Sequence, residues 1–123
     1  MEKILTIAGR EIPARSTAAS LFTYKARFGR DGLKDLFALA KGMSKADANE
    51  DDIAALVDSD RFDADVFLRF LWVFARSADK SIPPMEQWLE SMEVAPLDFI
   101  IEALPQTMDM LMTTAKSGVK PKN

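Results

Sequence analysis

The sequence predicts a mainly α fold in which an N-terminal β-hairpin is followed by a bundle of about five helices. Three observations lead to this prediction. Apolar side chains alternate over residues 3–15, they recur at helical spacing through most of the later chain, and helix-breaking or helix-starting residues separate these stretches. The length of 123 residues is typical of one domain. We expect that domain to span residues 1–116 and a disordered basic tail to follow at 117–123.

Residues 3–15 have the pattern of a β-hairpin. Ile4 and Thr6, then Ile12 and Ala14, alternate with Leu5, Ile7 and polar neighbours around a turn at Ala8-Gly9-Arg10, where Gly9 can adopt a positive φ. Pro13 has no backbone N–H, so the second strand should lie at a sheet edge there. A lone hairpin is only marginally stable in water. It must therefore pack on the helices of its own chain or on a neighbouring subunit.

Two amphipathic helices should follow the hairpin. Ser16 or Thr17 can cap the first, and its apolar stripe comprises Ala18, Leu21, Tyr24 and Phe28. Gly29 is a natural residue to end that helix, and Asp31 can cap the next one. The second stripe comprises Leu33, Leu36, Phe37 and Ala40, with Gly42 as the expected end.

Residues 43–63 are polar and acidic, and we expect a mobile or partly ordered connection there because the apolar content is low. The acidic side chains Glu50, Asp51, Asp52, Asp58 and Asp60 invite comparison with a divalent-cation site. They lack the glycine and the terminal glutamate of a calcium-binding loop. A solubilising loop is the favoured interpretation.

A long helix should run from Ala64 to about Ala78, capped by Asp63. It is apolar almost all round, which is typical of the central helix of a bundle. Arg69 and Arg76 mark its polar stripe. One apolar face comprises Phe67, Phe70, Leu71 and Phe74, and Val66, Trp72 and Val73 lie outside that face.

Two further helices complete the prediction. Pro84 suits the first turn of a short helix with a stripe of Met85, Trp88, Leu89 and Met92. The last helix starts at Ala95-Pro96, should be kinked by Pro105 and should end at Gly118. Its predicted core stripe comprises Leu97, Ile100, Ile101, Leu104, Met108, Leu111 and Ala115.

The amino-acid composition limits the kinds of site that this chain can form. The chain has no Cys and no His, so disulfides, zinc sites of the usual kind and Ser-His-Asp catalysis are excluded. We expect no enzymatic activity, no cofactor and no resident metal. No window is apolar enough to span a bilayer and the N-terminus does not have the pattern of a secretory signal, so we expect a cytoplasmic protein without membrane association.

Charge is distributed unevenly along the chain. Residues 1–43 carry eight basic and four acidic side chains, residues 44–65 carry two and eight, and the whole chain has a net charge of −3. An acidic chain of this kind is not expected to bind nucleic acid. The oppositely charged regions can attract each other or neighbouring copies of the chain.

Several residues are candidates for binding a partner, each with a structural alternative. Lys25, Arg27, Arg30 and Lys34 can grip an acidic partner, although a solvated helix face is the simpler interpretation. On the last helix, Phe99, Met110 and Met112 can form a second apolar face for a partner helix, because methionine adapts to varied surfaces. Core filling is the alternative for these residues. Trp88 is either an interface anchor or a lock on its own core.

The order of these elements resembles the tail assembly chaperones of long-tailed phages and prophages. The hairpin ILTIAGREIPAR is followed by YKARFGRDGL, then by a long apolar helix ending at FARSAD, and then by PPMEQWLESM. The likeness extends from residue 3 to about residue 112. Lys25 stands where an Arg-like residue is common, and Gly32 where an apolar residue is common. The matching positions Tyr24, Phe28, Gly29, Arg30, Asp31 and Trp88 are expected to be mostly structural.

The resemblance implies a protein that binds the helical tape-measure protein and keeps it soluble before the tail tube polymerises. It also implies homo-oligomers or copies stacked along the tape measure, and contacts with other tail proteins. Two other readings stay open. One is a structural virion component such as a tail completion or connector protein. The other is a small regulatory or DNA-binding module, against which the acidic helix after Pro84 argues.

Overall fold

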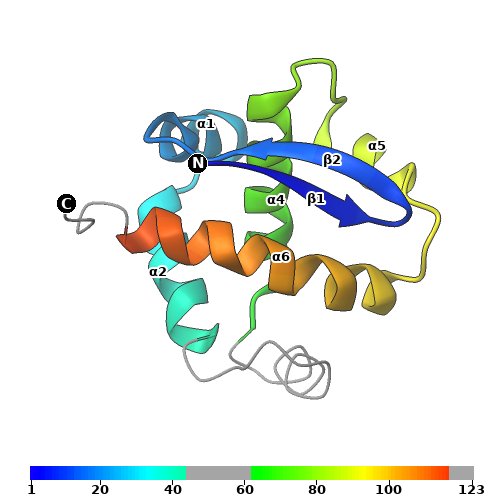
Figure 1. The fold of residues 1–123 in the computed structure, drawn as a ribbon. Coiled ribbons are helices and arrows are strands. Elements are labelled where there is room, and N and C mark those ends of the chain that lie inside the picture. Colours follow the sequence, from blue (N-terminus) through cyan, green and yellow to red (C-terminus); the bar gives the residue numbers. More distant parts are fainter. Residues whose placement is uncertain (44–61, 117–123) are drawn as a thin grey trace.

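A computed structural model describes residues 1–43 and 62–116 of the chain. It has an antiparallel two-stranded hairpin followed, within the described residues, by five helices (Figure 1). The mainly α fold class is therefore confirmed. Of the expected connection at 43–63, only residues 43, 62 and 63 are described. The acidic run that begins at Glu50 and the expected tail at 117–123 lie outside the described residues.

The hairpin joins β1 (Glu2–Ile7) to β2 (Arg10–Arg15) through a two-residue turn. Ala8 and Gly9 both have positive φ values, 54° and 74°, as a two-residue hairpin turn of the primed type requires. Leu5 pairs with Ile12, and these two side chains face inward with Ile7 and Ala14. The N-terminal ammonium donates to the Ser16 carbonyl at 2.7 Å and closes the open end of the hairpin.

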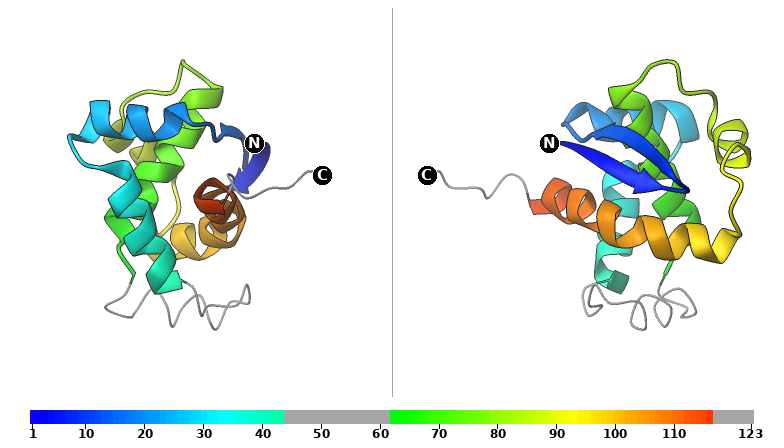
Figure 2. Two further views of the ribbon diagram at one scale, coloured as in Figure 1. Left: turned by 90° about the vertical axis from the view of Figure 1, so that its left-hand side faces the viewer. Right: turned by 45° about the vertical axis from the view of Figure 1, so that its right-hand side comes forward.

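The hairpin packs on its own chain. β2 lies against α4 (Ala64–Ala78), and β1 lies against α6 (Pro96–Lys116). Figure 2 shows the hairpin and α6 side by side. Pro13 pairs with Ile4, two residues along from the Thr6–Glu11 pair. Thr6 exchanges hydrogen bonds with the Gln106 side chain, so its backbone N–H and carbonyl point away from β2. Pairs two residues apart in an antiparallel ladder have the same orientation, so the backbone groups of Ile4 and Pro13 also point away from the partner strand. The missing N–H of Pro13 therefore leaves no ladder bond unmade.

α4 is the central helix, as the sequence predicts. Asp63 caps it by accepting from the N–H groups of Asp65 and Val66. Most of its middle section is buried: Val66, Phe67, Phe70, Leu71, Trp72, Val73, Phe74 and Ala75. The Trp72 indole donates to the Pro83 carbonyl at 2.8 Å, and Arg27 and Arg76 lie over its ring. The bond to Pro83 satisfies the indole N–H, which is the one polar group of this large buried side chain.

α1 (Ala19–Phe28) and α2 (Gly32–Met43) form a corner. The Thr17 hydroxyl accepts from Ala19 N–H, one residue before the formal cap Ala18, which makes no side-chain cap bond. Gly29 ends α1 with a φ of 69°, and its N–H donates to the Lys25 carbonyl. Asp31 starts α2 by accepting from Leu33 and Lys34 N–H. The stop and start signals of this corner are therefore confirmed.

The predicted inner face of α2 is wrong by about one residue. Gly32, Asp35, Leu36 and Leu39 are buried, whereas Leu33 is 44% exposed and Phe37 is 54% exposed. A Cβ atom on Gly32 would lie 3.2 Å from Leu21 and 3.3 Å from Tyr24, so α2 approaches α1 closely at this glycine. The Asp35 carboxylate also turns inward. Gly42 does not end the helix, because α2 continues to Met43.

The predicted inner face of α6 is partly right, because Leu104 and Leu111 are buried and Ile100, Ile101 and Met108 pack half-buried against the core. Leu97 is exposed, and the buried positions are Phe99, Ala103, Leu104, Thr107, Met110 and Leu111. The cause is the polar row Glu102, Gln106 and Asp109, which turns toward β1. Gln106 bonds Thr6, Glu102 accepts from Ala8 N–H, and Asp109 pairs with Lys3. The buried Thr107 hydroxyl donates to the Ala103 carbonyl, so its burial leaves no unmade hydrogen bond.

The short helix α5 (Met85–Glu90) follows Pro84, as predicted. Trp88 and Met92 are buried, and Met85 and Leu89 are half-buried. Pro105 lies inside α6 without ending it.

Candidate functional site

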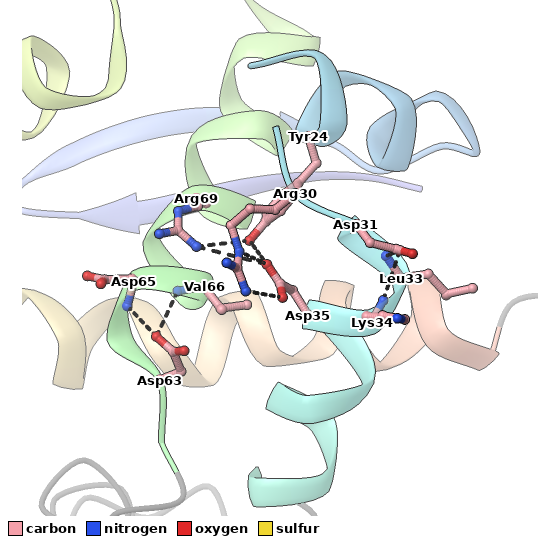
Figure 3. Close-up of polar contacts among 10 residues, drawn as sticks. All are labelled: Tyr24, Arg30, Asp31, Leu33, Lys34, Asp35, Asp63, Asp65, Val66 and Arg69. Carbon is pink, nitrogen blue, oxygen red and sulfur yellow. Dashed lines mark hydrogen bonds and ion pairs between the residues drawn. The ribbon is translucent and has the colours of Figure 1, made fainter. Parts of the chain in front are cut away.

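The corner between α1 and α2 is held by a cluster of four polar side chains: Tyr24, Arg30, Asp35 and Arg69 (Figure 3). Arg30 donates to both Asp35 carboxylate oxygens, at 2.7 and 2.8 Å. The Tyr24 hydroxyl donates to Asp35 Oδ2 at 2.8 Å. Arg69 of α4 donates to the Tyr24 hydroxyl at 3.4 Å and lies 3.9 Å from Asp35 Oδ2. The cluster therefore joins three helices and the loop between two of them.

The protonation states of the cluster follow from these contacts. Hydrogen bonds from Arg30 hold the pKa of the buried Asp35 carboxyl below its ordinary value, and Tyr24 and Arg69 act in the same direction. Burial raises the pKa of the Tyr24 hydroxyl to about 12. The bond to Asp35 raises the pKa of Arg30. At neutral pH the carboxylate is thus ionised and the phenol is neutral. Each of these side chains bonds another member of the cluster, so the cluster stabilises the fold of this corner.

The basic residues predicted to grip a partner divide into two pairs. Arg30 is paired with Asp35 rather than with Asp31, and Arg27 lies over the Trp72 ring at 5.3 Å. Lys25 and Lys34 are exposed. Two of the four candidates therefore have contacts that stabilise the chain itself, and partner binding by this set stays a prediction.

The apolar candidates are buried in the structure. Trp88 and Phe99 are almost fully covered, and Met110 is 0% exposed. The burial of Met110 supports core filling, the alternative weighed for it, and not an outward-facing partner contact, because α6 turns its Phe99–Met110 side into the core. The side chain of Met112 lies outside the described part of the chain. Of the apolar candidates, Phe99 lines a hollow that opens to the surface.

This hollow, the apolar pocket, lies where α4, α5 and the start of α6 meet. Its volume is about 190 Å³, which exceeds the roughly 150 Å³ of an apolar cavity that accepts benzene. Its walls are formed by Leu68 of α4, Leu89 of α5, and Met92, Val94, Pro96, Phe99 and Ile100. The apolar pocket is therefore large enough for one aromatic or branched aliphatic side chain.

A second hollow, of about 370 Å³, lies at the open end of the hairpin. Its lining includes Glu2, Lys3 and Arg15. Glu2 is paired with Arg15 at 3.0 Å, and Lys3 is paired with Asp109. Its other lining residues, Ile4, Pro13, Ala14 and Ala78, are apolar, but the paired charges share its surface. The apolar pocket has no charged lining residue and is therefore the better candidate for an apolar partner group.

Sequence reasoning missed both the buried carboxylate and the apolar pocket. Asp35 was hidden because the apolar residues of α2 fit two neighbouring stripes equally well. One signal was available, since Arg69 interrupts an otherwise apolar helix and therefore needs an acceptor. The apolar pocket joins residues from 68 to 100, and no local pattern brings Leu68 to Ile100.

Comparison with protein-family models, curated sequences and solved structures finds no match to this chain. None of the helices in the described residues has the length and apolar character needed to cross a membrane. Within residues 1–43 and 62–116, no group of three acidic side chains lies close enough to hold a metal ion.

Proposed function

We propose that this protein is a tail assembly chaperone of a long-tailed phage or prophage, which binds the tape-measure protein and keeps it soluble in the host cytoplasm during tail assembly. The observation that carries the proposal is the apolar pocket, a hollow open to the surface at the meeting point of three helices. The order of hairpin, Tyr24–Asp31 segment, long apolar helix and Pro-led helix supports it through the family resemblance.

The chemistry of the apolar pocket suits this role. A tape-measure protein exposes long apolar helix faces before the tube surrounds it, and such faces aggregate. A helix can place one of its apolar side chains in a groove of this size. Covering that side chain removes it from water without any covalent step, so release during tube assembly needs only competition.

Energetics favour several contacts along one partner. Burying one Leu or Phe side chain yields about 1.5–3 kcal/mol, whereas a micromolar complex needs about 8 kcal/mol. One apolar pocket is therefore too weak alone. Several copies along one extended helix gain from linked binding, which agrees with the stacked copies that the resemblance implies.

Co-expression with the tape-measure-like protein of the same genome tests the proposal. We expect that protein to remain in the soluble fraction and to co-purify with the chaperone, and to pellet when expressed alone. A tape-measure protein that pellets equally in both cases would refute the proposal. Recovery of the chain in mature particles at fixed copy number would instead identify a virion component.

A further inference from the structure

Three acidic residues, here called the rim residues, flank lining residues of the apolar pocket in the sequence. Glu90, Glu93 and Asp98 each adjoin a lining residue in the sequence, and all three side chains are exposed. Across residues 81–115 the chain has six acidic side chains and no basic one. The segment that supplies six of the seven lining residues of the apolar pocket is therefore acidic.

Few of these charges are compensated inside the chain. Glu102 accepts from the Ala8 N–H, and Asp109 pairs with Lys3 at the far end of α6. The other four, which are Glu86, Glu90, Glu93 and Asp98, make no ion pair within the described residues. Arg10 of the hairpin reaches this region, but it donates to the hydroxyl and carbonyl oxygens of Ser91. Arg10 therefore adds one positive charge to this region, and the four carboxylates that are unpaired within the described residues leave it with a net negative charge.

We propose that the apolar pocket binds a basic amphipathic helix, which inserts one aromatic or branched aliphatic side chain and sets Lys or Arg side chains against Glu90, Glu93 and Asp98. Opposite charges around an apolar anchor speed association and fix orientation. An acidic helix with the same apolar stripe is repelled, so the rim residues supply selectivity. This inference rests on the proposed function where it names the tape-measure segment that is bound, but the binding itself can be measured separately.

The chain carries a helix of the same chemistry. α2 exposes Leu33 and Phe37 beside the exposed Lys34. A second copy of the chain is therefore the competing occupant of the apolar pocket. The partner helix is favoured because α2 offers only a short exposed apolar face, which lies next to the acidic Asp31 and would meet the acidic rim residues.

Two synthetic helical peptides test the proposal. They share one stripe of Leu and Phe, and one peptide carries Lys on both flanks where the other carries Glu. Fluorescence anisotropy gives the Kd of each for the full chain. We expect the Lys peptide to bind about tenfold more tightly or better, and its affinity to fall as salt is raised.

Matched variants locate the binding. The rim variant Glu90→Gln with Glu93→Gln should weaken the Lys peptide by about fivefold. The control Glu2→Gln with Asp109→Asn removes the same charge from β1 and from the far half of α6, and it should leave the Kd unchanged. Val94→Phe fills the apolar pocket from the α5–α6 connection and should abolish binding. Circular dichroism and the Tm show that each variant is folded.

Three results would overturn the proposal. The first is an equal Kd for both peptides, or no binding of the Lys peptide to the folded chain. The second is an equal effect of the rim and control variants. The third is self-association in sedimentation that the rim variant abolishes and that excludes the peptide, which assigns the apolar pocket to a second copy. If the Lys peptide fails while the tape-measure protein is still solubilised, this inference fails and the proposed function stands.

Discussion

At the residue scale, Asp35 determines how the α1–α2 corner is built. Its carboxylate accepts from Tyr24 and from two nitrogens of Arg30, and Arg69 lies nearby. Because this carboxylate turns inward, the neighbouring Leu33 and Phe37 turn outward. One buried polar group thus decides which apolar residues of α2 reach the core.

Removing the charge of Asp35 should destabilise the fold. Asp35→Asn weakens the bonds from Arg30 and Tyr24 and leaves the half-buried Arg69 without a counter-charge, at a cost of about 2 kcal/mol. Tyr24→Phe removes the hydroxyl that donates to Asp35 and accepts a longer bond from Arg69, and it should cost about 1 kcal/mol. Urea unfolding measures both values. Equal stability of Asp35→Asn and the wild type would contradict the role given to the cluster.

The same carboxylate makes stability depend on pH. The folded pKa of Asp35 lies below its unfolded value, so the unfolded state binds the proton more readily as pH falls. The stabilisation is present above about pH 4 and is lost as pH drops through the folded pKa. The difference in unfolding free energy between the wild type and Asp35→Asn should therefore shrink below about pH 4. A difference that grows with acid would reverse the assigned sign.

At the element scale, α2 begins at its cap. Asp31 accepts from the N–H groups of Leu33 and Lys34 at 3.0 and 3.1 Å. Asp31→Ala should cost about 1 kcal/mol, and Asp31→Ser should recover most of this loss because serine also caps helices. Chemical denaturation midpoints with unchanged slopes give the comparison. If serine and alanine are equally destabilising, the side chain of Asp31 acts in another way.

The outer edge of β1 is closed by α6. Gln106 accepts from the Thr6 N–H and donates to the Thr6 carbonyl, both at 2.7 Å. Gln106→Ala should expose that edge and speed hydrogen exchange of the Thr6 amide about tenfold, while amides in the middle of α4 keep their rates. Thr6 exchange that stays slow in the variant would show that another group protects the strand.

Local signals predicted where elements begin and end more successfully than which face they bury. Gly9, Gly29, Asp31, Asp63 and Pro84 act through their own backbone or the next few N–H groups, so sequence alone is enough. Which face of a helix is buried depends on side chains from other elements of the fold. α2 was misjudged because the inward-facing Asp35 is satisfied by Tyr24 and Arg30, with Arg69 of α4 nearby. α6 was partly misjudged because Gln106 and Glu102 bond the hairpin.

At the scale of the whole molecule, the order of hairpin and helices followed from the sequence, and so did the central place of α4. The packing of the hairpin on its own chain did not, because a neighbouring subunit was an equal alternative. The apolar pocket was not predicted from the sequence either. Of its lining residues only Phe99 was among the partner-binding candidates, and the candidate Met110 is buried in the core. Surfaces built from distant segments have no local signature.

Binding of the tape-measure protein in the apolar pocket can be tested by co-expression. The measured quantity is the soluble fraction of the tape-measure-like protein in cells that also make wild type, Val94→Phe or Ile4→Phe. Val94 lines the apolar pocket, and Ile4 is an exposed side chain on the outer face of the hairpin. We predict that wild type and Ile4→Phe keep the tape-measure protein soluble and that folded Val94→Phe does not. Full solubility with a folded Val94→Phe variant would contradict the claim that the apolar pocket binds the partner.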